Sequence, residues 1–147
     1  MARLPGSVLF ACNHNSIRSP MAAGLLRQRH GRRVFVDSVG VRAMPIDPFV
    51  LAVMAELAID LRAHAPKTFV ELEDTSFDLV ISLTPEAQHR AVELTRTMAC
   101  EVEFWPSFDP GSVEGSREEV LAAYRSVRDA LMRRIGERFP DPSPDRG

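Results

Sequence analysis

The stretch SVLFACNHNSIRSP, from Ser7 to Pro20, decides the fold because a short apolar run passes through a polar loop directly into a helix start. The apolar residues of Ser7–Ala11 have the length and character of a buried strand. Ser19 followed by Pro20 is typical of a helix N-cap with proline in the first turn, which predicts a helix over Pro20–His30. Gly31 supplies its stop. A strand joined to a helix in this way is the first half of a parallel βαβ unit.

The rest of the chain repeats this alternation. Further strands are predicted at Val34–Ser38, Phe77–Leu83 and Cys100–Phe104. Helix starts are predicted at Asp47-Pro48, at the capping box Thr68 to Glu71, at Thr84-Pro85 for a helix to about Thr97, and at the capping box Ser116 to Glu119. The last helix carries one apolar stripe, formed by Val120, Tyr124, Val127, Leu131, Ile135 and Phe139. We therefore predict an α/β fold with a four-stranded parallel sheet and helices on both faces.

Length and composition limit the class of protein. The 147 residues are 45% hydrophobic and 26% charged, which is typical of a globular chain and excludes collagen-like, low-complexity and wholly disordered classes. We predict a single domain over residues 1–139. The proline-rich end, PDPSPDRG at 140–147, has little to bury and predicts a flexible tail.

Charge and cysteine content suggest where the protein works and what it avoids. The net charge of −2 gives no general attraction to nucleic acid or anionic membranes, so neither is an expected partner. Residues 1–66 nevertheless carry eight arginines against four acidic residues, which favours a local anion site in the first half. Cys12 and Cys100 can form at most one disulfide, and no signal peptide or membrane span is apparent. We expect a cytoplasmic protein.

The loop after the first strand has the features of an anion site that includes a nucleophile. Cys12 and Arg18 are separated by five residues, and backbone N–H groups in such a turn, together with the helix N-terminus, hold a tetrahedral oxyanion. Arg18 would bind two of its oxygens, and the same field favours the thiolate of Cys12, to which Ser19 can donate a hydrogen bond. The predicted phosphate-binding residues are Asn13, His14, Asn15, Ser16, Ile17, Arg18 and Ser19.

This loop resembles that of the low-molecular-weight protein tyrosine phosphatases and of the arsenate reductases that share their fold. The family pattern is Cys-x-Gly-Asn-x-x-Arg-Ser-Pro, and the resemblance extends over about Ser7 to Phe139. The matching residues here are Cys12, Asn15, Arg18, Ser19 and Pro20. The resemblance implies a flavodoxin-like sheet and a metal-independent phosphomonoesterase, most plausibly a protein tyrosine phosphatase, that needs no cofactor.

The resemblance also implies a role for Asp109. In the family an Asp-Pro pair after the fourth strand supplies the general acid, and Asp109-Pro110 stands at that place before the final helix. Cys12, Arg18 and Asp109 are therefore the expected catalytic residues. Cys12 would attack phosphorus, and Asp109 would protonate the leaving oxygen and then activate water.

Three positions depart from the family pattern. His14 replaces a glycine, where a Cβ is expected to strain the turn, and we interpret it as a solvent-facing residue because Cys12 and His14 alone make a poor metal site. Ile17 replaces a cysteine that protects the nucleophile in many members, so Cys12 should overoxidise more easily unless Cys100 can reach it. Cys100 is interpreted as a buried small hydrophobe.

The third departure leaves the substrate open, because Gly111-Ser112-Val113 lacks the aromatic residue of many phosphotyrosine-specific members. Phe49, Trp105 and Phe108 are candidates for an aromatic wall, although Phe49 and Trp105 suit the core equally well. Phosphorylated proteins or small phosphomonoesters are the expected substrates, with phosphate, sulfate or arsenate as anions of the site.

Two alternatives remain at this point. The first is arsenate reduction with an external thiol, because the segment 84–91, TPEAQHRA, has no cysteine for an internal thioredoxin-coupled relay. The second is a non-catalytic phosphate or phosphopeptide binder in which His14 spoils the attack geometry.

Overall fold

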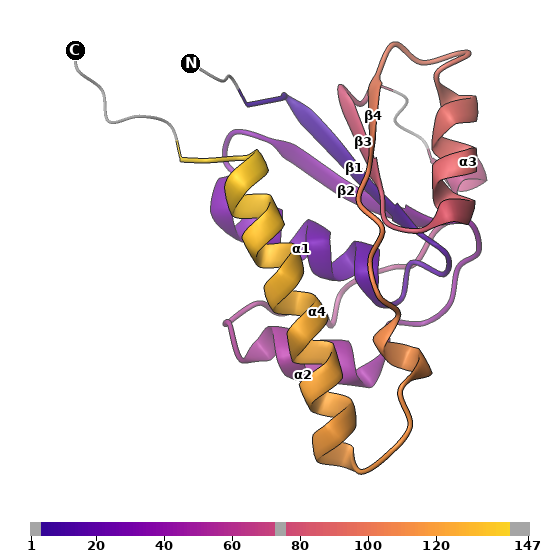
Figure 1. Ribbon diagram of the computed structural model, residues 1–147. Coiled ribbons are helices and arrows are strands. Elements are labelled where there is room, and N and C mark those ends of the chain that lie inside the picture. Colours follow the sequence, from indigo (N-terminus) through magenta and orange to yellow (C-terminus); the bar gives the residue numbers. More distant parts are fainter. Residues whose placement is uncertain (1–3, 73–75, 142–147) are drawn as a thin grey trace, which may run out of the picture.

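The computed structural model describes residues 4–72 and 76–141, and these residues contain a four-stranded parallel sheet (Figure 1). The strands are β1 (Ser7–Cys12), β2 (Phe35–Gly40), β3 (Leu79–Ser82) and β4 (Glu101–Phe104), in the order β2-β1-β3-β4. All three strand pairs are parallel, as predicted. β1 is therefore a central strand, and the loop that follows it leaves the middle of the sheet.

Helices cover both faces of the sheet, which confirms the predicted fold class. The helices are α1 (Arg18–His30), α2 (Pro48–Ala55), α3 (Pro85–Leu94) and α4 (Arg117–Arg138), with short 3-10 helices η1 (Phe69–Glu71) and η2 (Pro110–Ser112). Because successive side chains of a strand point to opposite faces, Val8 and Phe10 join one core with α1, α2 and α4. Leu9 and Ala11 join the other, beneath α3 and η1.

Local capping signals account for most helix starts. Asp47 accepts a hydrogen bond from the Phe49 N–H, and Thr84 accepts one from Ala87, each just before the proline that begins the helix. The capping boxes at Thr68 and at Ser116 are both present. These four predictions are confirmed. They could be made from the sequence because each cap involves groups within four residues of one another.

The start of α1 was predicted wrongly. The helix begins at Arg18 with Ile17 at the N-cap position, so Ser19 lies inside the first turn and does not cap it. The prediction failed because the Ser19 hydroxyl contacts the Cys12 sulfur and the Val39 carbonyl and is not available to cap the helix. Elsewhere the predicted strand ends differ from the observed ones by one or two residues, and α3 ends at Leu94 instead of near Thr97.

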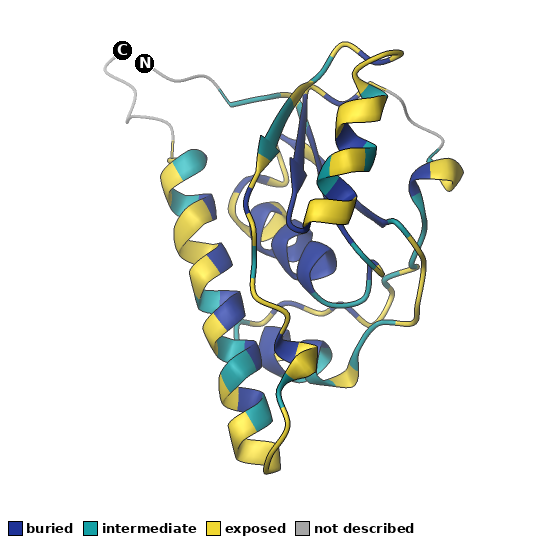
Figure 2. Ribbon diagram, turned by 45° about the vertical axis from the view of Figure 1, so that its right-hand side comes forward, coloured by how far each residue is buried: buried dark blue, intermediate teal, exposed yellow. Residues whose placement is uncertain are grey.

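The long helix α4 packs one stripe of its surface against α1, α2 and the sheet, as the pattern predicts (Figure 2). Its stripe is buried except for the partly buried Val120, and the buried members are Tyr124, Val127, Leu131, Ile135 and Phe139. Of the predicted tail, only Pro140 and Asp141 fall within the described residues, where both are exposed. In the described part of the chain no helix is both long and apolar enough to cross a membrane.

Candidate active site

The site is built on the loop of residues 12–18, which joins the carboxyl end of β1 to the amino end of α1. The loop after β2 fastens it through backbone hydrogen bonds: Arg42 N–H donates to the Asn13 carbonyl (2.8 Å) and Asp47 N–H to that of Ser16 (3.1 Å). Gly40 permits this approach, because a Cβ there would lie 2.6 Å from the Asn15 nitrogen. The 12–18 loop is thus held by backbone groups on the β2 side.

Cys12 lies at the base of this loop and is 2% exposed. Its Sγ is 3.0 Å from Ser19 Oγ, and the Ser19 N–H donates to the same sulfur at 3.4 Å. The contact between Ser19 and the sulfur that the sequence predicts is therefore present. The Ser19 N–H and the amino end of α1 therefore both face this sulfur.

Asn15 organises the loop from its inner side. Its backbone is in the left-handed region (φ 54°), which asparagine tolerates better than most residues. The fully buried side chain donates to Ser19 Oγ and Ser38 Oγ, both at 2.9 Å, and accepts from Lys67 N–H at 3.0 Å. Asn15 thereby links the hydroxyl that contacts Cys12 to β2 and to the segment before η1.

His64 also supports the loop, because its Nε2–H donates to the Asn15 carbonyl at 2.9 Å. Burial lowers the pKa of His64, and the positive charges of Lys67 and Arg27 act in the same direction. Sequence analysis missed both His64 and Lys67, which lie 49 and 52 residues from Asn15. No local pattern marks them, since their contacts exist only after the chain has folded.

Arg18 begins α1 and is 9% exposed. One terminal nitrogen donates to the Ser107 carbonyl at 2.9 Å, which fixes the plane of the guanidinium. Its Nε is buried and has no hydrogen-bond partner within the described residues. A buried cationic donor of this kind is costly unless an acceptor meets it, so Arg18 is prepared to bind an anion.

Asp109 lies in the segment that leads from β4 to η2 and is exposed to solvent. Its Oδ1 accepts from the Gly111 N–H at 2.9 Å, which caps the short turn. A Cβ on Gly111 would lie 3.2 Å from Ile17 Cδ1, so this turn packs against the 12–18 loop. Together with the bond from Arg18 to Ser107, this packing brings the Asp109 segment against the Arg18 end of the 12–18 loop.

The other predicted loop residues take different positions. Asn13 Oδ1 accepts from Thr84 Oγ1 (2.7 Å), which ties the loop to the start of α3, and Ile17 packs partly buried against the larger core. His14 is exposed, as predicted. The expected strain at His14 is absent, because the positive backbone angle belongs to Asn15.

Cys100 does not lie near Cys12. Glu101, the next residue, pairs with Leu79 of β3, which in turn pairs with Val8 at the opposite end of β1 from Cys12. The position of Cys100 is therefore about four residues from that of Cys12 along the strands, which is about 13 Å. The two positions are also two strands apart across the sheet, which is about 10 Å. Cys100 is partly buried, not fully buried as expected, and burial raises the pKa of its thiol.

Comparison with known proteins identifies the family. The model of the family described as low molecular weight phosphotyrosine protein phosphatase matches residues 7–137. The chain belongs to this family. Because the match extends from β1 almost to the end of α4, it includes the 12–18 loop, the Asp109 segment and the whole sheet.

Relatives within this family carry different names. An arsenate reductase of Halalkalibacterium halodurans is 31% identical over 128 residues, which are 87% of this chain and 91% of that protein. The solved low molecular weight protein tyrosine phosphatase from T. tengcongensis shares the fold with a TM-score of 0.76 at 23% identity, covering 92% and 99% of the two chains. An arsenate reductase in the phosphate binding state gives 0.69 at 25%, covering 89% and 94%. Family membership therefore leaves hydrolysis and arsenate reduction both to be considered.

Proposed function

We propose that this protein is a metal-independent phosphomonoesterase, acting on phosphotyrosine in proteins through a phosphocysteine intermediate. The observation that supports the proposal is the buried Nε of Arg18, which has no hydrogen-bond partner within the described residues and belongs to the same loop as the Cys12 sulfur. The turn that carries Asp109 packs against Ile17 of this loop. A binding module needs only the arginine and the loop amides, whereas all three groups together suit transfer of a phosphoryl group.

In the first step the Cys12 thiolate attacks phosphorus, so an S–P bond forms while the bond from phosphorus to the ester oxygen breaks. Asp109 gives its proton to that oxygen, and the alcohol or phenol leaves. Arg18 and the backbone N–H groups of the 12–18 loop stabilise the three non-bridging oxygens as charge develops on them. The exposure of Asp109 suits this role, because the leaving group must pass it on the way out.

In the second step water attacks phosphorus and the Asp109 carboxylate takes a proton from it. The S–P bond breaks, inorganic phosphate is released and Cys12 returns as a thiolate. Ser19 supports this step, since its backbone N–H donates to the sulfur and stabilises it as a leaving group. Phosphate, sulfate and arsenate, which share the tetrahedral shape, are expected to compete for the site.

Arsenate reduction is the second candidate, favoured by the 31% identical relative that bears this name. There the Cys12 thiolate would displace water from arsenate, and an external thiol would attack Cys12, leaving a mixed disulfide and arsenite. A second thiol would then reduce the disulfide. An internal relay is disfavoured, because Cys100 lies at the other end of the sheet.

The decisive experiment is hydrolysis of p-nitrophenyl phosphate without added metal by wild type, Cys12→Ser and Asp109→Asn. We expect Cys12→Ser to lose more than about a thousandfold in kcat. Asp109→Asn should lose about a hundredfold or more on phenyl phosphate, and less on p-nitrophenyl phosphate, whose leaving group needs no acid.

Arsenite formation from arsenate, with glutathione and glutaredoxin supplied, is measured in parallel. Reduction without ester hydrolysis would reject the phosphatase and support the reductase. Phosphate binding with neither activity would leave a binding module.

A further inference from the structure

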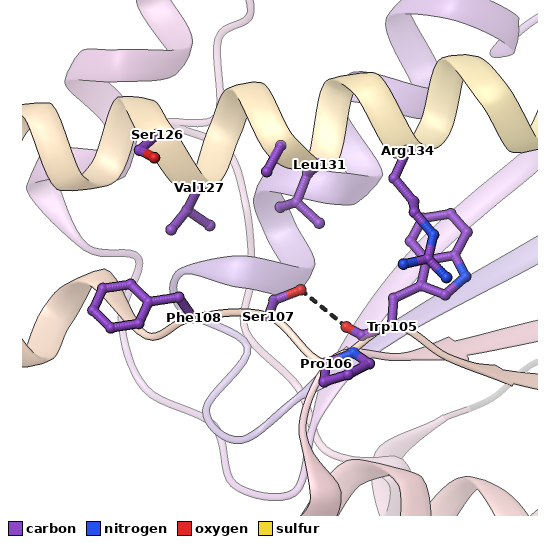
Figure 3. A pocket seen from close by; sticks show the side chains of 9 residues that line it. Trp105, Pro106, Ser107, Phe108, Ser126, Val127, Leu131 and Arg134 are labelled. Atoms are coloured by element: carbon purple, nitrogen blue, oxygen red, sulfur yellow. Dashed lines mark hydrogen bonds between the residues drawn. The ribbon is translucent and has the colours of Figure 1, made fainter.

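A groove lies between the segment 105–108 and one side of α4, just before Asp109 (Figure 3). It encloses about 280 Å³. Its floor and walls are formed by Trp105, Pro106, Ser107, Phe108, Val127 and Leu131, with Ser126, Ala130 and Arg134 along its helical rim. The rim residues are spaced four apart, so they lie on one line along the helix. Because Ser126 and Ala130 are small, that line leaves the groove open.

This groove shares its backbone with the candidate active site. The Ser107 carbonyl accepts the hydrogen bond from Arg18, while Ser107 also lines the groove. Phe108 precedes Asp109 directly and is 61% exposed, an unusual position for a large apolar side chain. Because Phe108 is adjacent to Asp109 in the chain, the end of the groove that Phe108 lines is next to the residue expected to protonate the leaving oxygen.

The other end of the groove is positively charged. The Arg134 guanidinium lies 4.9 Å from the centre of the Trp105 ring, and the side chain is exposed. Arg128 is paired with Glu56 and Asp129, and Arg138 with Glu103, whereas Arg133 does not line the groove. Arg134 forms no such ion pair with any described residue, so it complements an acidic group.

We propose that this groove binds the polypeptide of a phosphoprotein substrate, taking an apolar residue along its floor and an acidic residue at Arg134. The dimensions agree with this occupant: three extended residues span about 10 Å, and the rim from Ser126 to Arg134 spans about 12 Å. The acidic residue then lies about three residues from the phosphorylated one. This inference rests on the proposed phosphatase activity and adds its substrate preference.

The test compares two synthetic phosphotyrosine peptides, ELApYALE and KAApYAAK, which are symmetrical because the chain direction in the groove is left open. Wild type is expected to hydrolyse the first with a kcat/KM about five- to tenfold higher. Arg134→Glu should abolish or reverse this preference, and Ala130→Trp, which fills the groove, should remove it. Turnover of p-nitrophenyl phosphate should stay unchanged in both variants, because that ester does not reach the groove.

Two matched controls lie on the same helix. Arg133→Glu changes the net charge equally, and Met132→Trp adds an indole at an exposed position on another side of the helix; neither residue lines the groove, so both should keep the wild-type preference. Equal kcat/KM for the two peptides in wild type, or an unchanged preference in Arg134→Glu, would overturn the proposal. Self-association that Ala130→Trp abolishes would assign the groove to a second copy of the chain and would overturn it as well.

Binding of the same peptides, labelled with fluorescein, to the Cys12→Ser variant separates this inference from the proposed function. If p-nitrophenyl phosphate is not hydrolysed, the phosphatase proposal fails, but a preference for ELApYALE in fluorescence anisotropy that Arg134→Glu removes would still support the docking groove. Absence of that preference would reject the groove, whatever the activity.

Discussion

At the scale of single residues, Asn15 decides the shape of the 12–18 loop. Its backbone adopts a left-handed conformation, and its side chain forms hydrogen bonds with Ser19, Ser38 and the Lys67 backbone. A glycine would allow the same angle but would supply none of these hydrogen bonds. The sequence marks Asn15 through the family motif, yet it gives no sign of the partners that hold it.

His64 is one such partner, and it makes the stability of the protein depend on pH. Because burial lowers its pKa from 6.5, the folded state binds a proton less readily than the unfolded state. The contribution of His64 to the free energy of unfolding is fully present above pH 6.5. It is lost as the pH falls below 6.5 toward and through the lower pKa that His64 has in the folded state. We predict that His64→Gln flattens this decline, measured by urea unfolding at pH 7.5 and 5.5.

The comparison needs His14→Gln as a control, since the side chain of His14 is exposed to solvent, and this variant should leave the decline intact. An equal loss of stability between the two pH values in wild type and in His64→Gln would remove His64 from this role.

At the scale of elements, a hydrogen bond from α4 reaches the residue that caps α2. Asp47 caps α2 with one carboxylate oxygen and accepts from the Tyr124 hydroxyl with the other, at 2.8 Å, while its N–H donates to Ser16 in the 12–18 loop. Burial raises the pKa of Tyr124, and the carboxylates of Asp47 and Asp109 add to this effect, so the hydroxyl stays protonated and donates. The same hydroxyl faces Gly111 of the Asp109 turn.

We therefore predict two effects of Tyr124→Phe. The free energy of unfolding should fall by about 1.5–3 kcal/mol, because a carboxylate loses its donor. Hydrolysis of phenyl phosphate should fall more than hydrolysis of p-nitrophenyl phosphate, because the turn that carries Asp109 loses a neighbour that fixes it. Urea unfolding and the ratio of the two rates measure these effects.

Ile135→Val is the control for this prediction, since Ile135 is buried in α4 away from Asp47 and the change costs about 0.5–1.5 kcal/mol. It should lower stability and leave the ratio of rates unchanged. A ratio that stays constant in Tyr124→Phe would reduce the hydroxyl to a packing role.

Elements were predictable from the sequence where their signals are local. Asp47-Pro48, Thr84-Pro85 and the Ser116 capping box all begin the helices that they predict. Ser19-Pro20 looks the same in the sequence but does not mark the start of its helix. The hydroxyl of Ser19 contacts the Cys12 sulfur instead of capping, and the helix has already begun at Arg18. A local pattern cannot distinguish a cap from a residue whose hydroxyl is taken by a distant group.

At the scale of the whole molecule, the parallel sheet brings the segments of the candidate site together at the carboxyl ends of its strands. The carboxyl ends of β1, β2 and β4 supply the 12–18 loop, the supporting loop and the Asp109 segment, and the strand order keeps β1 between its neighbours. The location of the site could be predicted from the sequence, because parallel sheets bind ligands at the carboxyl ends of their strands. The groove beside α4 could not, because it depends on which small residues face the segment 105–108.

The same sheet holds the two cysteines apart, and this separation predicts the response to peroxide. Their levels differ by about 13 Å along the strands and about 10 Å across them, whereas a disulfide needs Cα atoms within about 7 Å. Cys12 oxidised to a sulfenic acid therefore has no internal thiol to trap it, and further oxygen atoms add irreversibly. We expect Cys100→Ser to be inactivated by hydrogen peroxide at the wild-type rate. Intact-mass spectra should show added oxygen on both proteins, and a loss of two hydrogens in wild type alone would mean that the sheet opens far enough for the thiols to meet.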